Sequence, residues 1–344
     1  MRDVIARLRQ PLSPAQYRRI TVVALVLLIL IVVTGAGVRL TGSGLGCTDW
    51  PNCTDQKFVA DRGDTHQMIE FVNRLITGLV SAAVAVAVLG SRRRAPRRRD
   101  LTWLSWGLVA GVVAQIGLGA VVVLSDLDPW LVQGHFVVSM LLLLDAVVLT
   151  HRAGLPDDRP VRPAVTSMLL RWGQALVGLA VVVILTGTLV TGSGPHSGRN
   201  EAEAGASRSE QLEAARDVRR LPIAVHDAAR IHGIAMIAFL AVAIWVLVQL
   251  RRHGAGQALV RAGTSLLTVL VLQGALGYTQ YFTGVPPLLV GLHVLGASLV
   301  WVAVLNVLLQ MRSPLVADGS VPPDWEREPS NADHLPHGDL VPGR

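Results

Sequence analysis

The sequence predicts an all-α membrane protein in which eight transmembrane helices form two pseudo-symmetric four-helix bundles. The composition, a series of long apolar runs and an internal repeat support this prediction. Of the 344 residues, 51% are hydrophobic and only 16% are charged. That is too apolar for a soluble chain of this size. An apolar run of about 20 residues is long enough to cross a hydrocarbon core of about 30 Å.

The first predicted helix covers residues 20–38 and follows Arg18 and Arg19. The run is longer than the core of a signal peptide, and no small-residue cleavage pattern follows it, so we expect a retained membrane span. The other seven predicted helices cover residues 75–91, 103–124, 130–150, 169–192, 232–250, 264–282 and 287–311.

The loops between the helices alternate between basic and acidic. Basic residues crowd the N-terminus and the run "RRRAPRRR" at residues 92–99, whereas the intervening loops carry Asp and Glu. Because positive loops stay in the cytoplasm, this pattern predicts a multi-pass protein of the cell membrane with both termini cytoplasmic. The formal net charge of +7 is therefore a signal of topology. We expect membrane lipid around the chain, and no nucleic-acid partner.

An internal repeat accounts for the number of helices. The stretch "QIGLGAVVVLSDLDPWLVQGH" (residues 115–135) matches "QGALGYTQYFTGVPPLLVGLH" (residues 273–293) in its Gln, Leu, Gly, Pro, Val and His positions. "TGAGVRLTGSG" likewise resembles "TGTLVTGSG" in the second half. Helix bundles build cofactor sites from side chains on facing helices. The predicted organisation is a cytoplasmic segment (1–19), a first half (20–152), a cytoplasmic linker (153–168), a second half (169–311) and a disordered cytoplasmic tail (312–344).

Three histidines, His135, His232 and His293, fall inside apolar helices at one predicted depth. Each precedes the basic residue that closes its helix by a similar number of residues, which places all three near the outer face at about 1.5 Å per residue. Imidazoles on facing helices at one height suit the two axial positions of a haem iron. The alternatives are histidines that only satisfy local carbonyls, and a zinc site, for which no cluster of four ligands is present in the sequence.

The stretch "IEFVNRL" (residues 69–75) breaks the symmetry between the halves. Asn73 occupies the position that His232 occupies in the second half, and Glu70 lies one turn away on the same helical face. An amide is a poor iron ligand. We therefore predict that His232 and His293 hold one haem tightly, whereas His135 holds another beside a carboxylate. The alternative for Glu70 is an interfacial ion pair with Arg74.

Several polar residues near these positions have two interpretations each. His66 could ligate iron if its helix begins early, or it could be a loop residue that supports the site. The same alternative applies to His226. Arg39 could pair with a haem propionate or extend to the membrane interface. Cys47 and Cys53 lie in an outer loop, where a disulfide is expected, with either a structural or a redox role.

The segments "TGAGVRLTGSGLGCTDWPNC" (34–53), "IEFVNRL" and "LLVGLHVLGASLVW" (288–301) resemble the haem A synthase family across most of residues 20–311. The resemblance implies that the C8 methyl of haem O is oxidised to a formyl group by successive hydroxylations, with water as the oxygen source. It implies a haem b held by His232 and His293, and a substrate haem O held by His135.

The resemblance also assigns the family's essential glutamate to Glu70. The chain departs from the family pattern at Asn73, where a histidine is expected. Haem O synthase and the assembly of a terminal oxidase are the implied protein partners, together with possible homo-oligomers.

Two other functions fit parts of the sequence. One is a bis-histidine cytochrome b that transfers electrons without haem O chemistry, and the other is a transporter built on the repeat. The matched depth of the histidines favours a haem protein over a transporter. Glu70 and the missing fourth histidine favour a substrate site over simple electron transfer.

Overall fold

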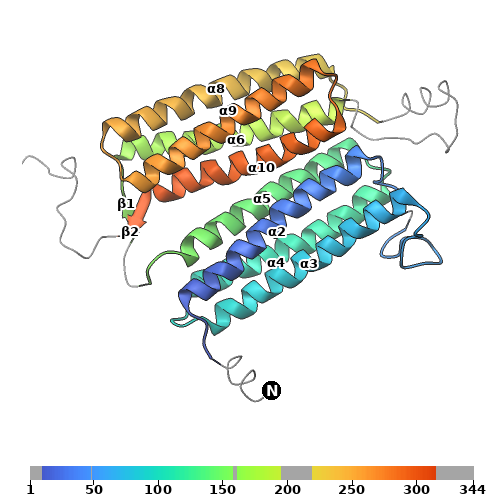
Figure 1. The fold of residues 1–344 in the computed structure, drawn as a ribbon, viewed down its shortest axis with the longest axis horizontal. Helices are drawn as coiled ribbons and strands as arrows, with labels where there is room; N and C mark the ends of the chain where they lie inside the picture. Colours follow the sequence, from blue (N-terminus) through green and yellow to red (C-terminus); the bar gives the residue numbers. More distant parts are fainter. Residues whose placement is uncertain (1–9, 48, 158–160, 195–218, 315–344) are drawn as a thin grey trace, which may run out of the picture.

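The computed structural model describes residues 10–47, 49–157, 161–194 and 219–314. Within them, eight helices are long and apolar enough to cross a membrane, which confirms the predicted all-α membrane fold (Figure 1). They are α2 (Pro14–Leu40), α3 (Thr65–Arg93), α4 (Arg99–Leu124), α5 (Pro129–Ala153), α6 (Ser167–Ser193), α8 (Val225–Arg252), α9 (Gln257–Phe282) and α10 (Pro287–Gln310).

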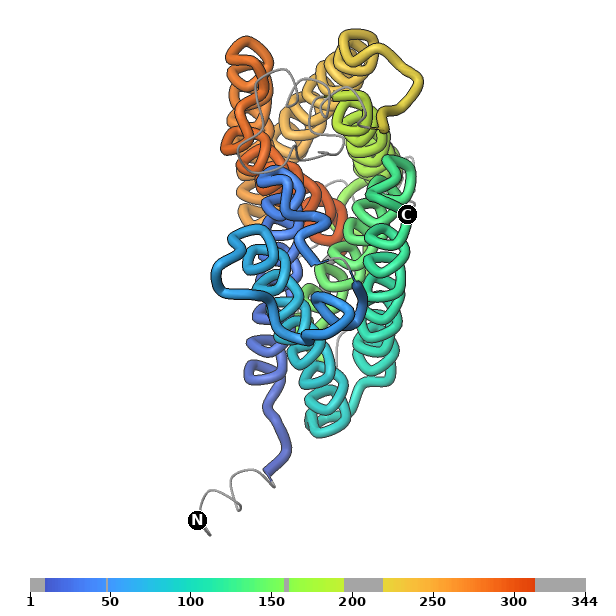
Figure 2. Tube along the Cα trace, turned by 90° about the vertical axis from the view of Figure 1, so that its right-hand side faces the viewer, coloured from blue at the N-terminus to red at the C-terminus, as the bar shows by residue number. Residues whose placement is uncertain are grey.

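The helices form two four-helix groups that lie side by side (Figure 1). In the first group α2, α3, α4 and α5 pack in a ring, and in the second α6, α8, α9 and α10 do the same. The helix pairs α3/α5 and α8/α10 therefore stand on the diagonals of their rings. The groups meet through α2, α5, α6 and α10, and Figure 2 shows α2 and α10 beside each other at this boundary.

The boundary between the halves is part of one continuous apolar core. Trp301 of α10 is buried there, and its indole Nε1 donates a hydrogen bond of 2.9 Å to the carbonyl of Met140 in α5. A buried indole N–H needs such a partner. This contact fixes the position of α10 against α5.

Helix α3 begins well before the predicted start at residue 75. The carboxylate of Asp64 caps its first turn by accepting hydrogen bonds from the backbone N–H groups of His66 and Gln67. A capped polar turn can precede the apolar run, because side-chain caps satisfy the first N–H groups of a helix. The whole "IEFVNRL" stretch therefore lies within the helix.

Two short strands connect the linker to the end of the second half. Strand β1 (Val161–Pro163) pairs antiparallel with β2 (Arg312–Pro314), with Arg162 opposite Ser313. Residues 312–314 belong to the segment that the sequence assigns to a disordered tail, and here they form a strand directly after α10. Residues 315–344, the N-terminal residues 1–9 and the polar loop 195–218 lie outside the described residues.

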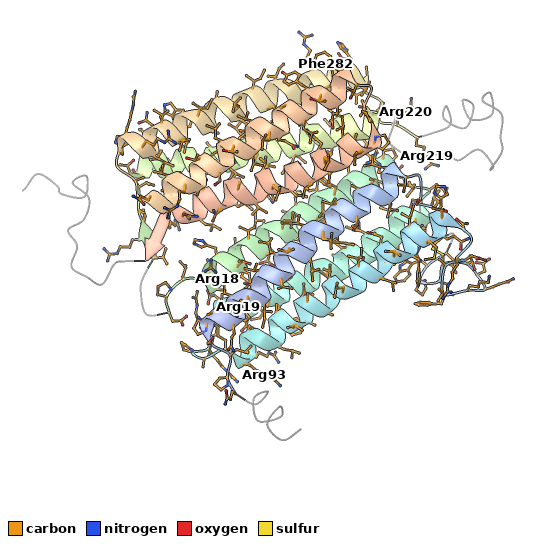
Figure 3. The ribbon with its side chains drawn as sticks, in the orientation of Figure 1. Arg18, Arg19, Arg93, Arg219, Arg220 and Phe282 are labelled. Carbon is orange, nitrogen blue, oxygen red and sulfur yellow. A yellow bond between two sulfur atoms is a disulfide. The ribbon has the colours of Figure 1, made fainter. Side chains whose placement is uncertain are left out.

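The two ends of the molecule differ in character. Figure 3 shows Arg18, Arg19 and Arg93 at one end, which we call the basic end, and Arg219 at the other. Helices α3, α5, α8 and α10 all start at this second end. The loop that joins α2 to α3 also lies there, and we call this the loop end (Figure 1).

Candidate functional site

The three predicted histidines lie at matching positions near the loop end. His135 is about two turns into α5, His232 is about two turns into α8, and His293 is about two turns into α10. All three imidazoles are half-buried. Because α8 and α10 are diagonal in their ring, His232 and His293 lie on opposite helices of the second half.

The same side-chain contact positions a histidine in each half. The amide of Gln115 in α4 donates a hydrogen bond of 3.0 Å to the backbone carbonyl of His135. In the second half, the amide of Gln273 in α9 donates one of 2.8 Å to the carbonyl of His293. The repeat seen in the sequence therefore extends to individual contacts, since both pairs of residues keep one spacing along the chain.

Glycines allow neighbouring helices to approach the imidazoles closely. A Cβ atom on Gly187 would lie 3.2 Å from Cε1 of His232, and one on Gly277 would lie 3.1 Å from Cε1 of His293. Gly119 lies beside the ring of His135 in the first half, but a Cβ there would be 3.6 Å from Cε1, which is an ordinary van der Waals distance. Small residues at such positions let helix backbones pack closely within a membrane. Larger side chains would displace the rings.

Hydrogen bonding determines which nitrogen of His232 is free. The hydroxyl of Thr186 in α6 already donates its single hydrogen to the carbonyls of Val182 and Val183. Its oxygen lies 3.1 Å from Nδ1 of His232. With its hydrogen on one of those carbonyls, the hydroxyl can accept a hydrogen bond from a protonated Nδ1. The neutral ring then presents the lone pair of Nε2. A partner on the other nitrogen is the usual support for a histidine that ligates a metal.

The other two imidazoles also retain unused nitrogen atoms. Nδ1 of His135 and Nδ1 of His293 are buried, and neither has a hydrogen-bond partner within the described residues. Buried polar atoms without partners are uncommon in native proteins and require an explanation. Imidazoles with free ring nitrogens, backed by glycines and set on diagonal helices, fit the axial ligands of a haem.

The first half lacks the threonine contact. Asn73 of α3 stands where His232 stands in the second half, and its side-chain Oδ1 is buried with no partner among the residues described. Thr34, the counterpart of Thr186, donates only to the carbonyl of Ile31, at 3.3 Å. The first half thus opposes one imidazole on α5 to an amide on α3.

Glu70 is a buried carboxylate with two strong partners. Its side chain is only 7% exposed, although it belongs to the second turn of α3. One oxygen accepts a hydrogen bond of 2.9 Å from the backbone N–H of Cys47, and the other lies 2.6 Å from the guanidinium of Arg74. The ion pair with Arg74 is therefore present. It fixes the carboxylate one turn from Asn73.

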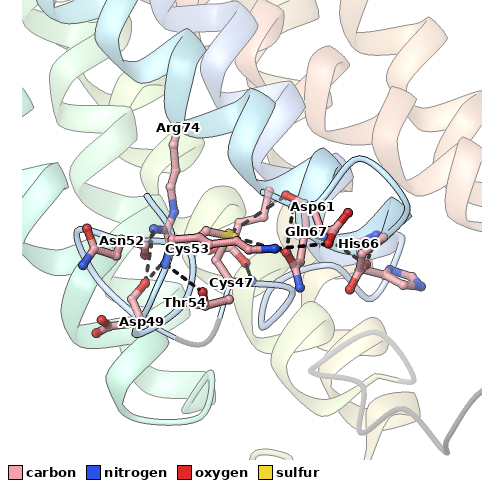
Figure 4. The surroundings of a disulfide bond; sticks show 12 residues. Cys47, Asp49, Asn52, Cys53, Thr54, Asp61, His66, Gln67 and Arg74 are labelled. Atoms are coloured by element: carbon pink, nitrogen blue, oxygen red, sulfur yellow. Dashed lines mark hydrogen bonds and ion pairs between the residues drawn. A yellow bond between two sulfur atoms is a disulfide. The ribbon is translucent and has the colours of Figure 1, made fainter. Parts of the chain in front are cut away.

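Cys47 and Cys53 form a disulfide, as predicted, with an S–S distance of 2.05 Å. Arg74 also binds the short loop that this bond closes. Its guanidinium donates to the carbonyls of Asp49 at 3.2 Å and Asn52 at 2.9 Å (Figure 4). The disulfide loop, Arg74 and Glu70 thus form one connected unit.

The remaining candidates lie at the edges of the site. Nδ1 of His66 is 2.9 Å from the hydroxyl of Ser43, in the loop that follows α2. His226 is exposed in the first turn of α8, and its Nδ1 lies 3.0 Å from a carboxylate oxygen of Asp227.

Arg39 connects the two halves at the loop end. Its Nη2 donates to the carbonyl of Thr191 in α6 at 3.2 Å. Its Nε is buried and has no partner within the described part of the chain. The guanidinium therefore keeps one donor for a group that would lie between the halves.

Sequence reasoning raised the ion pair of Arg74 with Glu70, but it missed the contact of Thr186 with His232 and the contacts of Arg74 with the disulfide loop. Thr186 lies in the repeated Thr-Gly segment, so the repeat itself contained a clue to its position. Arg74 binds backbone carbonyls of the loop, and no pattern of residue types in the sequence predicts such contacts.

The fold and these contacts define a multi-pass membrane protein built from two related four-helix halves, each with imidazole on one diagonal of its ring. The family model described as "Cytochrome oxidase assembly protein", COX15-CtaA, matches residues 18–305. The chain belongs to this family.

Among similar proteins are those named heme A synthase from three bacteria. The one from Lysinibacillus sphaericus is 30% identical over 176 residues, which cover 49% of this chain and 56% of that protein. The one from Symbiobacterium thermophilum is 32% identical over 181 residues, covering 48% and 57%. The match to the protein from Halalkalibacterium halodurans is longer, at 26% identity over 268 residues, 77% of this chain and 84% of that protein. The chain spans a little over half the length of the first two relatives.

Proposed function

We propose that this protein is a haem A synthase, an oxidoreductase that converts the C8 methyl group of haem O to a formyl group. The difference between the two halves carries the proposal. The second half opposes His232 and His293 on diagonal helices, whereas the first half opposes His135 to a helix that carries Asn73 and the buried Glu70. One half is suited to a permanent cofactor, and the other to a haem that enters and leaves.

The second half would hold haem b through His232 and His293. The contact with Thr186 supports this assignment, because it leaves Nε2 of His232 free to ligate iron. When bound, haem b supplies one-electron transfer. The glycines beside both rings keep the imidazoles oriented across the ring of helices.

The first half would bind haem O through His135. His66 lies in the first turn of α3, about two turns before Asn73, and its Nδ1 contacts Ser43 in the loop that follows α2, so we assign it a role in supporting that loop. An open or weakly held axial face on the Asn73 side suits a haem that must be released as product. The free Nε of Arg39 at the boundary of the halves would pair with a propionate.

The reaction balances with water as the oxygen source. Conversion of a methyl group and one net water to a formyl group releases four protons and four electrons, and the electrons leave to an acceptor outside this chain. Two successive hydroxylations give a diol, which loses water to form the aldehyde. Glu70 would orient the attacking water and accept protons. Arg74 and the N–H of Cys47 hold its carboxylate in position.

The proposed setting is the cell membrane, with both termini in the cytoplasm and the haem sites near the outer face. The many arginines of the basic end support this orientation by the positive-inside rule (Figure 3). The proposed protein partners are a haem O synthase, a terminal oxidase under assembly, and further copies of this chain in a homo-oligomer.

The test is co-expression with a haem O synthase, followed by chromatography of the extracted haems. We expect haem A from the unaltered protein. Glu70→Gln should keep the low-spin haem b spectrum and abolish haem A, because the carboxylate is lost while the second half is intact. His232→Ala or His293→Ala should remove that spectrum. Intact haem b together with unconsumed haem O in the unaltered protein would instead indicate an electron-transfer cytochrome b, the second candidate function.

A further inference from the structure

An open pocket of about 640 Å³ lies between the end of α3 and the start of α4, far from the histidines and at the basic end. Its walls contain Arg92, Arg97, Arg99, Thr102, Trp103 and Trp106. The side chains of Arg92, Arg97 and Arg99 are exposed, and none of them has a carboxylate partner within the described residues. The pocket therefore presents three uncompensated positive charges.

The nearby carboxylates are already engaged by other arginines. Both oxygens of Asp157 accept hydrogen bonds from the buried Arg94, at 2.8 and 2.9 Å. Asp100 pairs in the same way with Arg98, whose shortest contact is 2.8 Å. These pairs hold the turn between α3 and α4 in place. They leave no acidic group in this turn to neutralise the pocket.

The other wall of the pocket is aromatic and continues into an apolar surface. Trp103 is 75% exposed, and the guanidinium of Arg92 lies 5.9 Å from the centre of the Trp106 ring. Exposed apolar side chains follow along α4 at helical spacing, at Trp103, Trp106, Val113, Val121 and Leu124. Tryptophan is typical of the boundary between headgroups and acyl chains. The pocket thus opens onto the face of α4 that meets the hydrocarbon.

We propose that this pocket binds an anionic phospholipid. Arg92, Arg97 and Arg99 hold the phosphate, and an acyl chain runs down the exposed face of α4 past Trp103. A free phosphate ion would use only the guanidinium groups, and a zwitterionic lipid carries no net negative charge for them to attract. Only an anionic lipid uses both the charged and the apolar parts of the pocket. The proposal is independent of the haem chemistry.

The first test uses the full-length protein in nanodiscs of phosphatidylcholine with a minor fraction of phosphatidylglycerol, and native mass spectrometry to count retained lipids. The combined variant Arg92→Gln, Arg97→Gln, Arg99→Gln should retain phosphatidylglycerol roughly tenfold less than the unaltered protein.

The matched control is Arg19→Gln, Arg171→Gln, Arg252→Gln, which removes three exposed charges from the same end but outside the pocket. It should retain the lipid normally. Equal losses in both triple variants, or no loss in the pocket variant, would overturn the proposal.

A second measurement locates the acyl chain. Phosphatidylglycerol brominated on its acyl chains should quench the fluorescence of Trp103, measured as the difference between the unaltered protein and Trp103→Phe. Brominated phosphatidylcholine at the same fraction should quench it less, and equal quenching contradicts the proposal. Inorganic phosphate should not displace the retained lipid in the first test. Full displacement by phosphate would indicate a site for free anions instead.

Discussion

At the scale of single residues, the two halves differ in the side chain at one equivalent position and in its hydrogen-bond partner. Where the second half has His232 supported by Thr186, the first has Asn73, whose Oδ1 is buried without a partner within the described residues. A ligand supported by a hydrogen bond is oriented before the metal arrives, which favours tight binding. The unsupported amide favours an exchangeable ligand. In the proposed function, these two contacts would account for the difference between a resident haem in the second half and a transient one in the first.

Replacement of Thr186 by Val should weaken haem b binding in the second half. The change removes the oxygen that accepts the Nδ1 hydrogen of His232, and loss of such a contact commonly lowers metal affinity by roughly 10- to 100-fold. The measurement is retention of the low-spin spectrum during dilution in detergent. Thr34→Val is the matched control, because the hydroxyl of Thr34 contacts only a backbone carbonyl in the described structure. Identical haem loss in both variants would argue against the proposed role.

Replacement of Gly277 by Ala should disturb the ring of His293. The added Cβ would lie 3.1 Å from Cε1 of the imidazole, so the ring must shift by a few tenths of an ångström. We expect a displaced Soret maximum or a changed haem b potential with the haem retained. Gly274→Ala, where a Cβ meets no atom within 4 Å, should leave both unchanged. A normal spectrum and potential for Gly277→Ala would show that the ring tolerates this contact.

At the scale of elements, the start of α3 and the disulfide loop work as one unit. Arg74 contacts the carboxylate of Glu70 and, through one planar group, several loop carbonyls. The Cys47 N–H completes the connection from the loop back to Glu70. A rigid loop that holds a carboxylate from both sides fixes its orientation more firmly than the helix could alone. The position of Glu70 therefore depends on the loop.

Replacement of Arg74 by Lys tests whether a positive charge beside Glu70 is enough, or whether the contacts of the guanidinium with the loop are also needed. Lysine keeps a positive charge near Glu70, but it cannot span the carboxylate and the loop carbonyls together. We expect haem A formation to fall by roughly 100-fold, since small displacements of a catalytic group are costly, while haem b in the second half is unchanged. Arg62→Lys, at an exposed position between the disulfide loop and the start of α3, should have normal activity. Full activity in Arg74→Lys would mean that the charge alone is enough.

The sequence predicts some elements of the fold better than others, and the reasons are physical. Apolar runs located all eight helices, because a membrane span must be apolar over most of its length. They missed the first turns, such as the start of α3 at Thr65, because polar caps determine where those turns begin. The common level of the three histidines could be read from their spacing to the basic residues that close their helices. The loop contacts of Arg74 could not, since they involve backbone atoms that only folding brings near.

At the scale of the whole molecule, the halves share a core and a small number of polar contacts. The Trp301 indole reaches Met140 of the other half, and Arg39 reaches Thr191. Both contacts cross the boundary at which α2, α5, α6 and α10 meet. Contacts of this kind hold the two bundles at a constant separation.

Replacement of Trp301 by Phe should destabilise the whole protein without removing haem b. The change loses a buried hydrogen bond and part of a packed ring, for which we expect a cost of about 1–2 kcal/mol. The measurement is the midpoint of thermal unfolding in detergent, monitored by the loss of the helical far-UV circular dichroism signal. Trp103→Phe, on the exposed face of α4, serves as the control and should unfold normally. Equal midpoints for the two variants would show that the Trp301 contact does not tie the halves together.

The pairing of β1 with β2 has a practical consequence for dissecting the molecule. Both strands border the second half, although β1 precedes α6 and β2 follows α10. A gene cut upstream of Val161 would give a second fragment that closes on itself through this ladder. A cut downstream of Pro163 would put β1 and β2 on different polypeptides. Their pairing would then be a contact between the two fragments. With a cut upstream of Val161, association of the two fragments would depend on contacts between the helices alone. With a cut downstream of Pro163, it would depend also on the pairing of β1 with β2.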